Sequence, residues 1–147
     1  MRTSANKSTR TQEPTSILHR LRDSDLQLAD PKADIRGRKV KDAAGEEIGK
    51  VDDLLVDAEE QKVRFLEVAS GGLLGLGETK SLIPVEAVAR ITEDEVYINQ
   101  TRAKVAGAPK YDPNLKERTH LSEVYGYYGY GTPYWGMGYN YPRYPYL

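Results

Sequence analysis

The sequence contains no cysteine, only two histidines, and a single phenylalanine and a single tryptophan. Without cysteine there can be no disulfide, thiolate metal site or thiol nucleophile, and the chain fits a reducing compartment. His19 and His120 lie far apart with no cysteine beside them, so no zinc site is expected. Ser70 and Ser81 have no histidine near them in the sequence to activate them. The residues therefore predict no catalytic group, no metal and no cofactor, and the chain is not expected to be an enzyme.

Long apolar runs are also missing. No window approaches the roughly 18 apolar residues of a membrane span. The basic, hydroxyl-rich stretch 1–10 leads into no apolar segment of the kind that signal peptides contain. We therefore expect a soluble, cytoplasmic protein.

The charges are nearly balanced, with 21 Lys and Arg against 22 Asp and Glu and a net charge of −1. This balance gives no global field that would favour DNA or an acidic membrane surface as the partner. The hydrophobic fraction of 39% is low for a fully packed globule of this length. The chain is accordingly divided into an N-terminal arm (1–33), a folded domain (34–105), a linker with a short helix (106–125) and a tail (126–147).

Short apolar runs separated by turn signals fill the stretch from Asp34 to Ile98 and leave no room for a long helix. This pattern is typical of an all-β domain, here a small β-barrel of about six strands joined by local, antiparallel hairpins. Pro84 predicts an edge strand or a bulge, because proline cannot donate a ladder hydrogen bond. The expected strands are 35–41, 48–56, 62–69, 80–84, 88–91 and 96–98.

The N-terminal arm is expected to be largely disordered, since residues 1–15 have no apolar periodicity. Ile17, Leu18 and Leu21 share one face of a helical turn, which predicts a short segment lying on the barrel. Pro31 then ends any helix before the first strand of the barrel.

The C-terminal region begins with a helix signal. Asn114 followed by Glu117 has the spacing of an N-cap with a reciprocating acid, and apolar residues recur on one helical face as far as about Tyr125. The helical face consists of Leu121, Val124, Tyr125 and Tyr128. The tail 126–147 is a low-complexity Tyr/Gly/Pro segment that is not expected to hold one conformation.

The glycine-rich loop 70–79 has the outline of a phosphate-binding loop but lacks its decisive residue. Such a loop needs lysine directly after its last glycine, and Glu78 follows Gly77 here. No nucleotide site is therefore expected. The acidic residues of 52–60 lack the alternating ligands and central glycine of a calcium loop and are interpreted as solvated turn charges.

Two elements are candidates for protein interaction. The loop carries Leu73, Leu74 and Leu76, which either dock a partner or cap the barrel core. The tail carries Tyr134 and Trp135 among many tyrosines, which offer stacking and hydrogen-bonding groups for a protein partner, for self-association, or for no partner at all.

RNA stacking on the tail is less favoured, because only Arg143 is basic from Val124 onward and stacking sites normally include a basic groove.

Several blocks of the folded domain together closely resemble the PRC-barrel domain family, over about Asp34 to Ile98. These blocks are Asp34-Ile35-Arg36-Gly37-Arg38-Lys39-Val40, Gly45-Glu46-Glu47-Ile48-Gly49-Lys50-Val51-Asp52-Asp53-Leu54-Leu55-Val56-Asp57, Val63-Arg64-Phe65-Leu66-Glu67-Val68 and Leu82-Ile83-Pro84-Val85-Glu86-Ala87-Val88. The resemblance implies a docking module without catalytic residues, in a small bacterial protein of a kind often labelled stress-response.

The family also includes the cytoplasmic domain of the photosynthetic reaction-centre H subunit and the C-terminal domain of a ribosome maturation factor. The resemblance therefore implies two alternatives, a peripheral assembly role in a photosynthetic or electron-transfer complex and an RNA-linked role in ribosome assembly. We expect neither the membrane helix of the first protein nor the N-terminal barrel of the second in this sequence. The partner stays unidentified, and a homo-oligomer and peripheral membrane association stay open.

Overall fold

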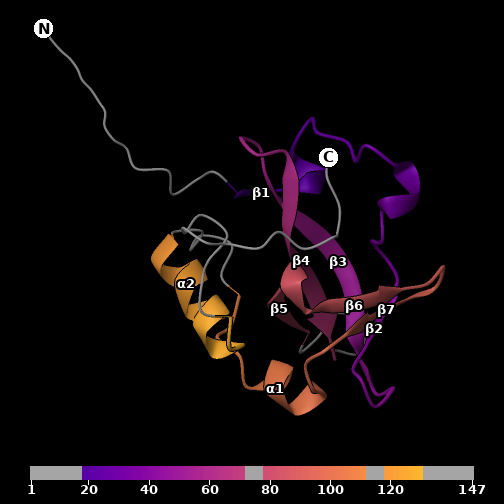
Figure 1. Ribbon diagram of the computed structural model, residues 1–147, viewed down its shortest axis with the longest axis vertical. Coiled ribbons are helices and arrows are strands. Elements are labelled where there is room, and N and C mark those ends of the chain that lie inside the picture. Colours follow the sequence, from indigo (N-terminus) through magenta and orange to yellow (C-terminus); the bar gives the residue numbers. More distant parts are fainter. Residues whose placement is uncertain (1–17, 72–77, 112–117, 131–147) are drawn as a thin grey trace, which may run out of the picture.

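The computed structural model of the protein describes residues 18–71, 78–111 and 118–130 (Figure 1). Within these residues the fold is a seven-stranded sheet with few helices, which confirms the predicted all-β class. The strand path of the described residues does not close into a complete barrel, and we use the word barrel for this sheet. The strands are β1 (Leu18–Arg20), β2 (Lys39–Lys41), β3 (Glu47–Asp57), β4 (Lys62–Ser70), β5 (Thr79–Pro84), β6 (Val88–Ile91) and β7 (Glu95–Ile98). The helices are α1 (Arg102–Ala106), α2 (Arg118–Tyr127) and the 3₁₀ turns η2 (Leu21–Asp23), η3 (Pro31–Ala33) and η4 (Val85–Ala87).

The strands follow the order β5-β4-β3-β2-β7-β6, with β1 also paired to β3. β5 therefore lies at one end of the path, and Pro84 is its last residue, which confirms the predicted edge position. β2 is shorter than predicted, because residues 35–38 form a turn closed by the Arg38 amide on the Ile35 carbonyl at 3.2 Å. Gly37 supplies the positive φ of 90° that this turn requires.

One pairing differs from the expectation of purely antiparallel hairpins. β2 and β7 are parallel, with Lys39 opposite Glu95 and Lys41 opposite Tyr97. The β6–β7 hairpin returns to the free edge of β2 after the chain has passed through three other strands. Local turn signals could not reveal this contact, because it joins segments that are distant in sequence.

The backbones of β3 and β4 approach each other closely at Gly49. A Cβ atom on Gly49 would lie 2.3 Å from the carbonyl oxygen of Ala69 and 3.0 Å from the Cβ atom of Ser70. Only glycine fits this contact, and it lies at the end of the β3–β4 pair that is nearest the loop after β4.

α2 seals the core with the helical face predicted from the sequence. Leu121, Val124, Tyr125 and Tyr128 are all buried, and the Tyr125 ring lies 5.5 Å from the ring of Phe65 on β4. The helix continues to Tyr127. It lies beside β4 and β5 in Figure 1 and contacts β5.

The N-terminal arm lies on the barrel, but as a strand rather than as the expected helical turn. β1 pairs antiparallel with the end of β3, with Leu18 opposite Asp57 and Arg20 opposite Leu55. β2 occupies the same edge of β3 only as far as Lys50, so the rest of that edge is left for another strand. The unpaired backbone groups of β3 thus select an extended conformation for the arm.

Candidate functional site

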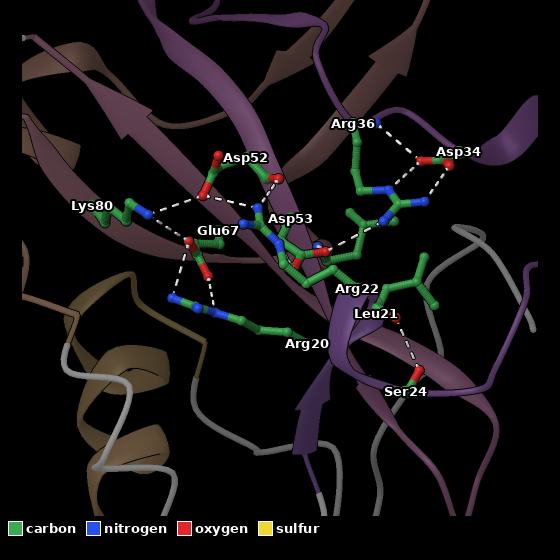
Figure 2. Close-up of polar contacts among 11 residues, drawn as sticks. Arg20, Leu21, Arg22, Ser24, Asp34, Arg36, Asp52, Asp53, Glu67 and Lys80 are labelled. Carbon is green, nitrogen blue, oxygen red and sulfur yellow. Dashed lines mark hydrogen bonds and ion pairs between the residues drawn. The ribbon is translucent and has the colours of Figure 1, made fainter. Parts of the chain in front are cut away.

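A group of eight charged side chains lies where the arm crosses β3 and β4 (Figure 2). We call it the charge cluster. Its cations are Arg20, Arg22, Arg36 and Lys80, and its anions are Asp34, Asp52, Asp53 and Glu67.

A bulge in the β3–β4 pair brings the carboxylates together. The register shifts between Val51 and Asp53, so Asp52 has no direct partner and Asp53 stands opposite Glu67. The side chains of Asp53 and Glu67 are fully buried, whereas Asp52 is half-buried. A bulge allows two adjacent residues to reach a site that strict alternation would give to only one.

Glu67 is held by cations from two different strands. Arg20 donates from Nε to Glu67 Oε1 at 2.9 Å and from Nη2 to Oε2 at 3.4 Å. Lys80 Nζ lies 3.4 Å from Oε2. Burial raises the pKa of Glu67, and its hydrogen bond with Asp52 adds to this effect, while Arg20 and Lys80 oppose it.

Asp53 is held by the second arginine of the arm. Arg22 donates from Nε to Asp53 Oδ2 at 2.7 Å, and the Leu54 amide donates to Oδ1 at 2.8 Å. Arg36 lies 3.8 Å away on the other side. Each carboxylate oxygen of Asp53 therefore has a cation beside it.

Asp52 joins the two halves of the cluster. Lys80 donates to its Oδ2 at 3.0 Å, and Arg22 lies 3.1 Å from the same oxygen. Burial alone would raise the pKa of Asp52, but the hydrogen bond with Glu67 and the cations Lys80 and Arg22 lower it overall. The hydrogen bond with Asp52 in turn raises the pKa of Lys80. The cluster is satisfied internally and holds the arm on the barrel.

A second feature is a cleft of about 790 Å³ at the end of the barrel nearest α1. Its lining includes the apolar residues Ile48 and Ala69, together with Gly49 and several charged side chains. The lining residues are Gly37, Glu46, Glu47, Ile48, Gly49, Lys50, Val51, Asp52, Ala69, Ser70, Gly71, Glu78 and Arg102. A smaller cavity of about 300 Å³ shares Ile48, Ser70, Gly71 and Arg102 with it and extends toward α1 and Lys110.

The cleft differs from the cluster in how its charges are paired. Glu46, Lys50, Glu78 and Arg102 make no ion pair with any residue in the ranges that the structure describes. Three of them are on separate segments: the β2–β3 turn, the start of β5 and the start of α1. Among the described residues, the cleft thus presents charges of both signs that have no ion-pair partner, next to apolar lining residues.

The residues predicted for interaction from the sequence all lie outside the described ranges. Leu73, Leu74 and Leu76 belong to 72–77, and Tyr134 and Trp135 belong to 131–147. The segment 72–77 connects Gly71 to Glu78, both of which line the cleft. The role of these side chains stays a prediction.

The serines and histidines that the sequence offers for catalysis or metal binding lie on four different elements, namely β4, β5, β1 and α2. No three His, Cys, Asp or Glu side chains are grouped in the described part of the chain so as to hold a metal ion. Ser81 is buried on β5, and Ser70 lines the cleft at the end of β4. His19 is exposed on β1, and His120 lies on α2 beside Glu123.

The sequence analysis did not predict the charge cluster. Its interpretation of the acidic residues of 52–60 as solvated turn charges is wrong for Asp53 and Asp57, which are buried on β3. Two signals pointed to the cluster: the alternation of Arg20 and Arg22 in a segment with buried leucines, and adjacent aspartates at 52 and 53 inside a strand. Recognising the site also required the β1–β3 register, which places the arginines over the carboxylates.

The fold and these contacts define a small all-β domain with an added strand and an added helix. The family model of the PRC-barrel domain matches residues 31–105, and the chain belongs to this family. Domains of this family are in general protein-interaction modules. The search of curated proteins gave no match. None of the helices in the described ranges has the length and hydrophobicity needed to cross a bilayer.

Proposed function

We propose that the protein is a non-enzymatic docking module whose partner protein binds in the cleft between the β2–β3 turn, β5 and α1. The observation that carries this proposal is the set of unpaired charges around the cleft, formed by Glu46, Lys50, Glu78 and Arg102. In the charge cluster, by contrast, the charges are matched within the chain.

Physical chemistry favours a protein partner for such a cleft. Rim charges of both signs set the orientation of a partner and speed its association, and burial of the apolar lining residues adds affinity. The backbones of β3 and β4 approach closely in this lining, since a Cβ atom on Gly49 would lie 2.3 Å from the Ala69 carbonyl oxygen.

The experiment is affinity capture from host lysate with the full-length chain and two charge-reversal variants. Lys50→Glu combined with Arg102→Glu alters the cleft. Lys32→Glu is the matched control, since Lys32 is exposed on η3 and does not line the cleft. We expect one discrete protein to be captured by the unchanged chain and by Lys32→Glu and to be lost with the cleft variant. Equal recovery with all three proteins would contradict docking at the cleft.

The two alternatives implied by the family have less support from the contacts. An RNA-linked role in ribosome assembly needs a group of free basic side chains. Arg20, Arg22 and Arg36 are engaged with carboxylates, and Lys50 and Arg102 share the cleft with Glu46 and Glu78. A role in a photosynthetic assembly needs an integral membrane partner. The same capture experiment tests both, because ribosomal RNA recovery that falls steeply with salt would favour the first and an integral membrane protein in the eluate would favour the second.

A further inference from the structure

The arm that completes the charge cluster lies outside the family domain. The family match begins at residue 31, whereas β1, Arg20 and Arg22 precede it. Three of the four carboxylates of the cluster, Asp52, Asp53 and Glu67, lie on β3 and β4, inside the match. The domain thus provides a groove along the edge of β3, and an added segment fills it.

The arm binds this groove as a ligand strand would. β1 contributes a ladder with β3 over Leu18–Arg20, which is the pattern of β-strand addition. Leu18 and Leu21 are buried at 0% and 5% exposure. Arg20 and Arg22 reach Glu67 and Asp53, so backbone, apolar and ionic contacts all come from one short segment.

Residues 23–30, the first part of the connection between this segment and β2, are mostly exposed. Asp23, Asp25 and Gln27 are exposed, as is the pair Ala29 and Asp30. Leu28, with 9% exposure, is the one buried side chain of residues 22–30. The connection can therefore be redirected at a small loss of buried contacts.

A vacated groove is costly to leave empty. Asp53 and Glu67 are fully buried, and without the arm they would retain only Arg36 and Lys80 as nearby cations. Unpaired buried carboxylates and an open β-edge are both strongly unfavourable. The groove therefore demands a strand with leucine and arginine at the same spacing, and a second copy of this chain carries that strand.

We propose that the arm is exchangeable, so that two copies join by each placing residues 18–22 in the groove of the other. The closed monomer and the exchanged dimer then contain the same contacts, and they differ mainly in the path of residues 23–30. The high effective concentration of the tethered arm favours the monomer in dilute solution, and the dimer grows as the protein is concentrated.

The absence of cysteine makes a direct test available. His19 on β1 is the register partner of Val56 on β3. The full-length His19→Cys and Val56→Cys variants are mixed at high concentration, incubated and oxidised. Exchange predicts a disulfide that joins the two different variants, identified by mass spectrometry. The double variant in a single chain is the positive control, because its internal disulfide shows that the geometry allows the bond and locks the arm in place.

Light scattering on the unchanged chain provides a measurement without cysteine. We expect a dimer fraction that rises with concentration and is absent from the oxidised double variant. A dimer that persists when the arm is locked would mean that the copies meet through another surface and would overturn the proposal. Failure of the mixed disulfide to form, while the double variant oxidises, would overturn it as well.

The rate of exchange supplies a further criterion. Arg20→Ala weakens the arm equally in the monomer and in the dimer, so it is expected to leave the dimer fraction nearly unchanged. It should speed the appearance of mixed dimers by about tenfold or more, because the arm must detach before it can exchange. An unchanged rate would contradict exchange of the arm.

Discussion

Asp53 and Glu67 are direct register partners across β3 and β4, and neither side chain is exposed. Like charges placed opposite each other destabilise a sheet, and burial adds a desolvation penalty to both. The two arginines of the arm offset this cost. The charge cluster therefore makes the stability of the barrel depend on a segment outside the family domain.

Removing one arginine should expose this dependence. Arg20→Met keeps much of the side-chain packing and leaves Glu67 with Lys80 as its remaining cation. We expect the free energy of unfolding to fall by about 2 kcal/mol, less than for a buried pair that loses its whole partner. Urea titration measures the change. The double variant Arg20→Met/Glu67→Gln should recover part of the loss, and strictly additive effects would show that the pair is not coupled.

The raised pKa of Glu67 predicts a specific pH dependence. An acid whose pKa is higher in the folded state binds its proton more tightly there than in the unfolded chain. The stability of the protein therefore falls as the pH rises from the pKa of 4.5 in the unfolded chain through the higher pKa in the folded state. Glu67→Gln removes this contribution. Urea titrations from pH 4.5 to 7.5 should therefore show a more favourable trend with rising pH in the variant than in the unchanged chain. Parallel curves would contradict the raised pKa.

Two glycine substitutions should have opposite effects on the free energy of unfolding. Gly49→Ala places a Cβ atom 2.3 Å from the Ala69 carbonyl oxygen, so the backbone of one strand or the other must move. We expect the free energy of unfolding to fall by at least about 2 kcal/mol. Gly126→Ala in α2 meets no atom within 4 Å and should stabilise the protein by about 0.5 kcal/mol. Thermal melting of both variants tests this, and a neutral Gly49→Ala would show that the strands can separate at little cost.

Tyr128 should destabilise the protein in alkaline solution. Its hydroxyl is buried without a hydrogen-bond partner in the described structure, and burial raises its pKa well above the ordinary value of 10. Above pH 10 the unfolded chain loses this proton while the folded chain keeps it, so stability falls with rising pH. Tyr128→Phe should be neutral at pH 7, within about 0.5 kcal/mol, and should lessen the loss between pH 10 and 11. An alkaline loss equal to that of the unchanged chain would contradict this account.

The sequence predicted those parts of the fold that local patterns determine. The strands from β3 to β7 and the buried face of α2 follow from alternation, turn residues and helical spacing. The parallel contact of Lys39 with Glu95 and the strand conformation of Leu18–Arg20 did not follow, because each depends on an edge provided by a distant segment. The charge cluster was not predicted for the same reason, because Arg20 and Glu67 become neighbours only after the arm has docked.

The parallel pair of β2 and β7 has a consequence for the order in which the chain acquires its structure. β3, β4 and β5 can form as successive hairpins as soon as they are synthesised, since their contacts are between neighbours in sequence. β2 can complete its hydrogen bonding only when β7 has emerged from the ribosome, and α2 covers the core later still. During synthesis the edge of β2 therefore stays open until β7 is made, and the slowest step of folding is expected to be the arrival of the β6–β7 hairpin at that edge.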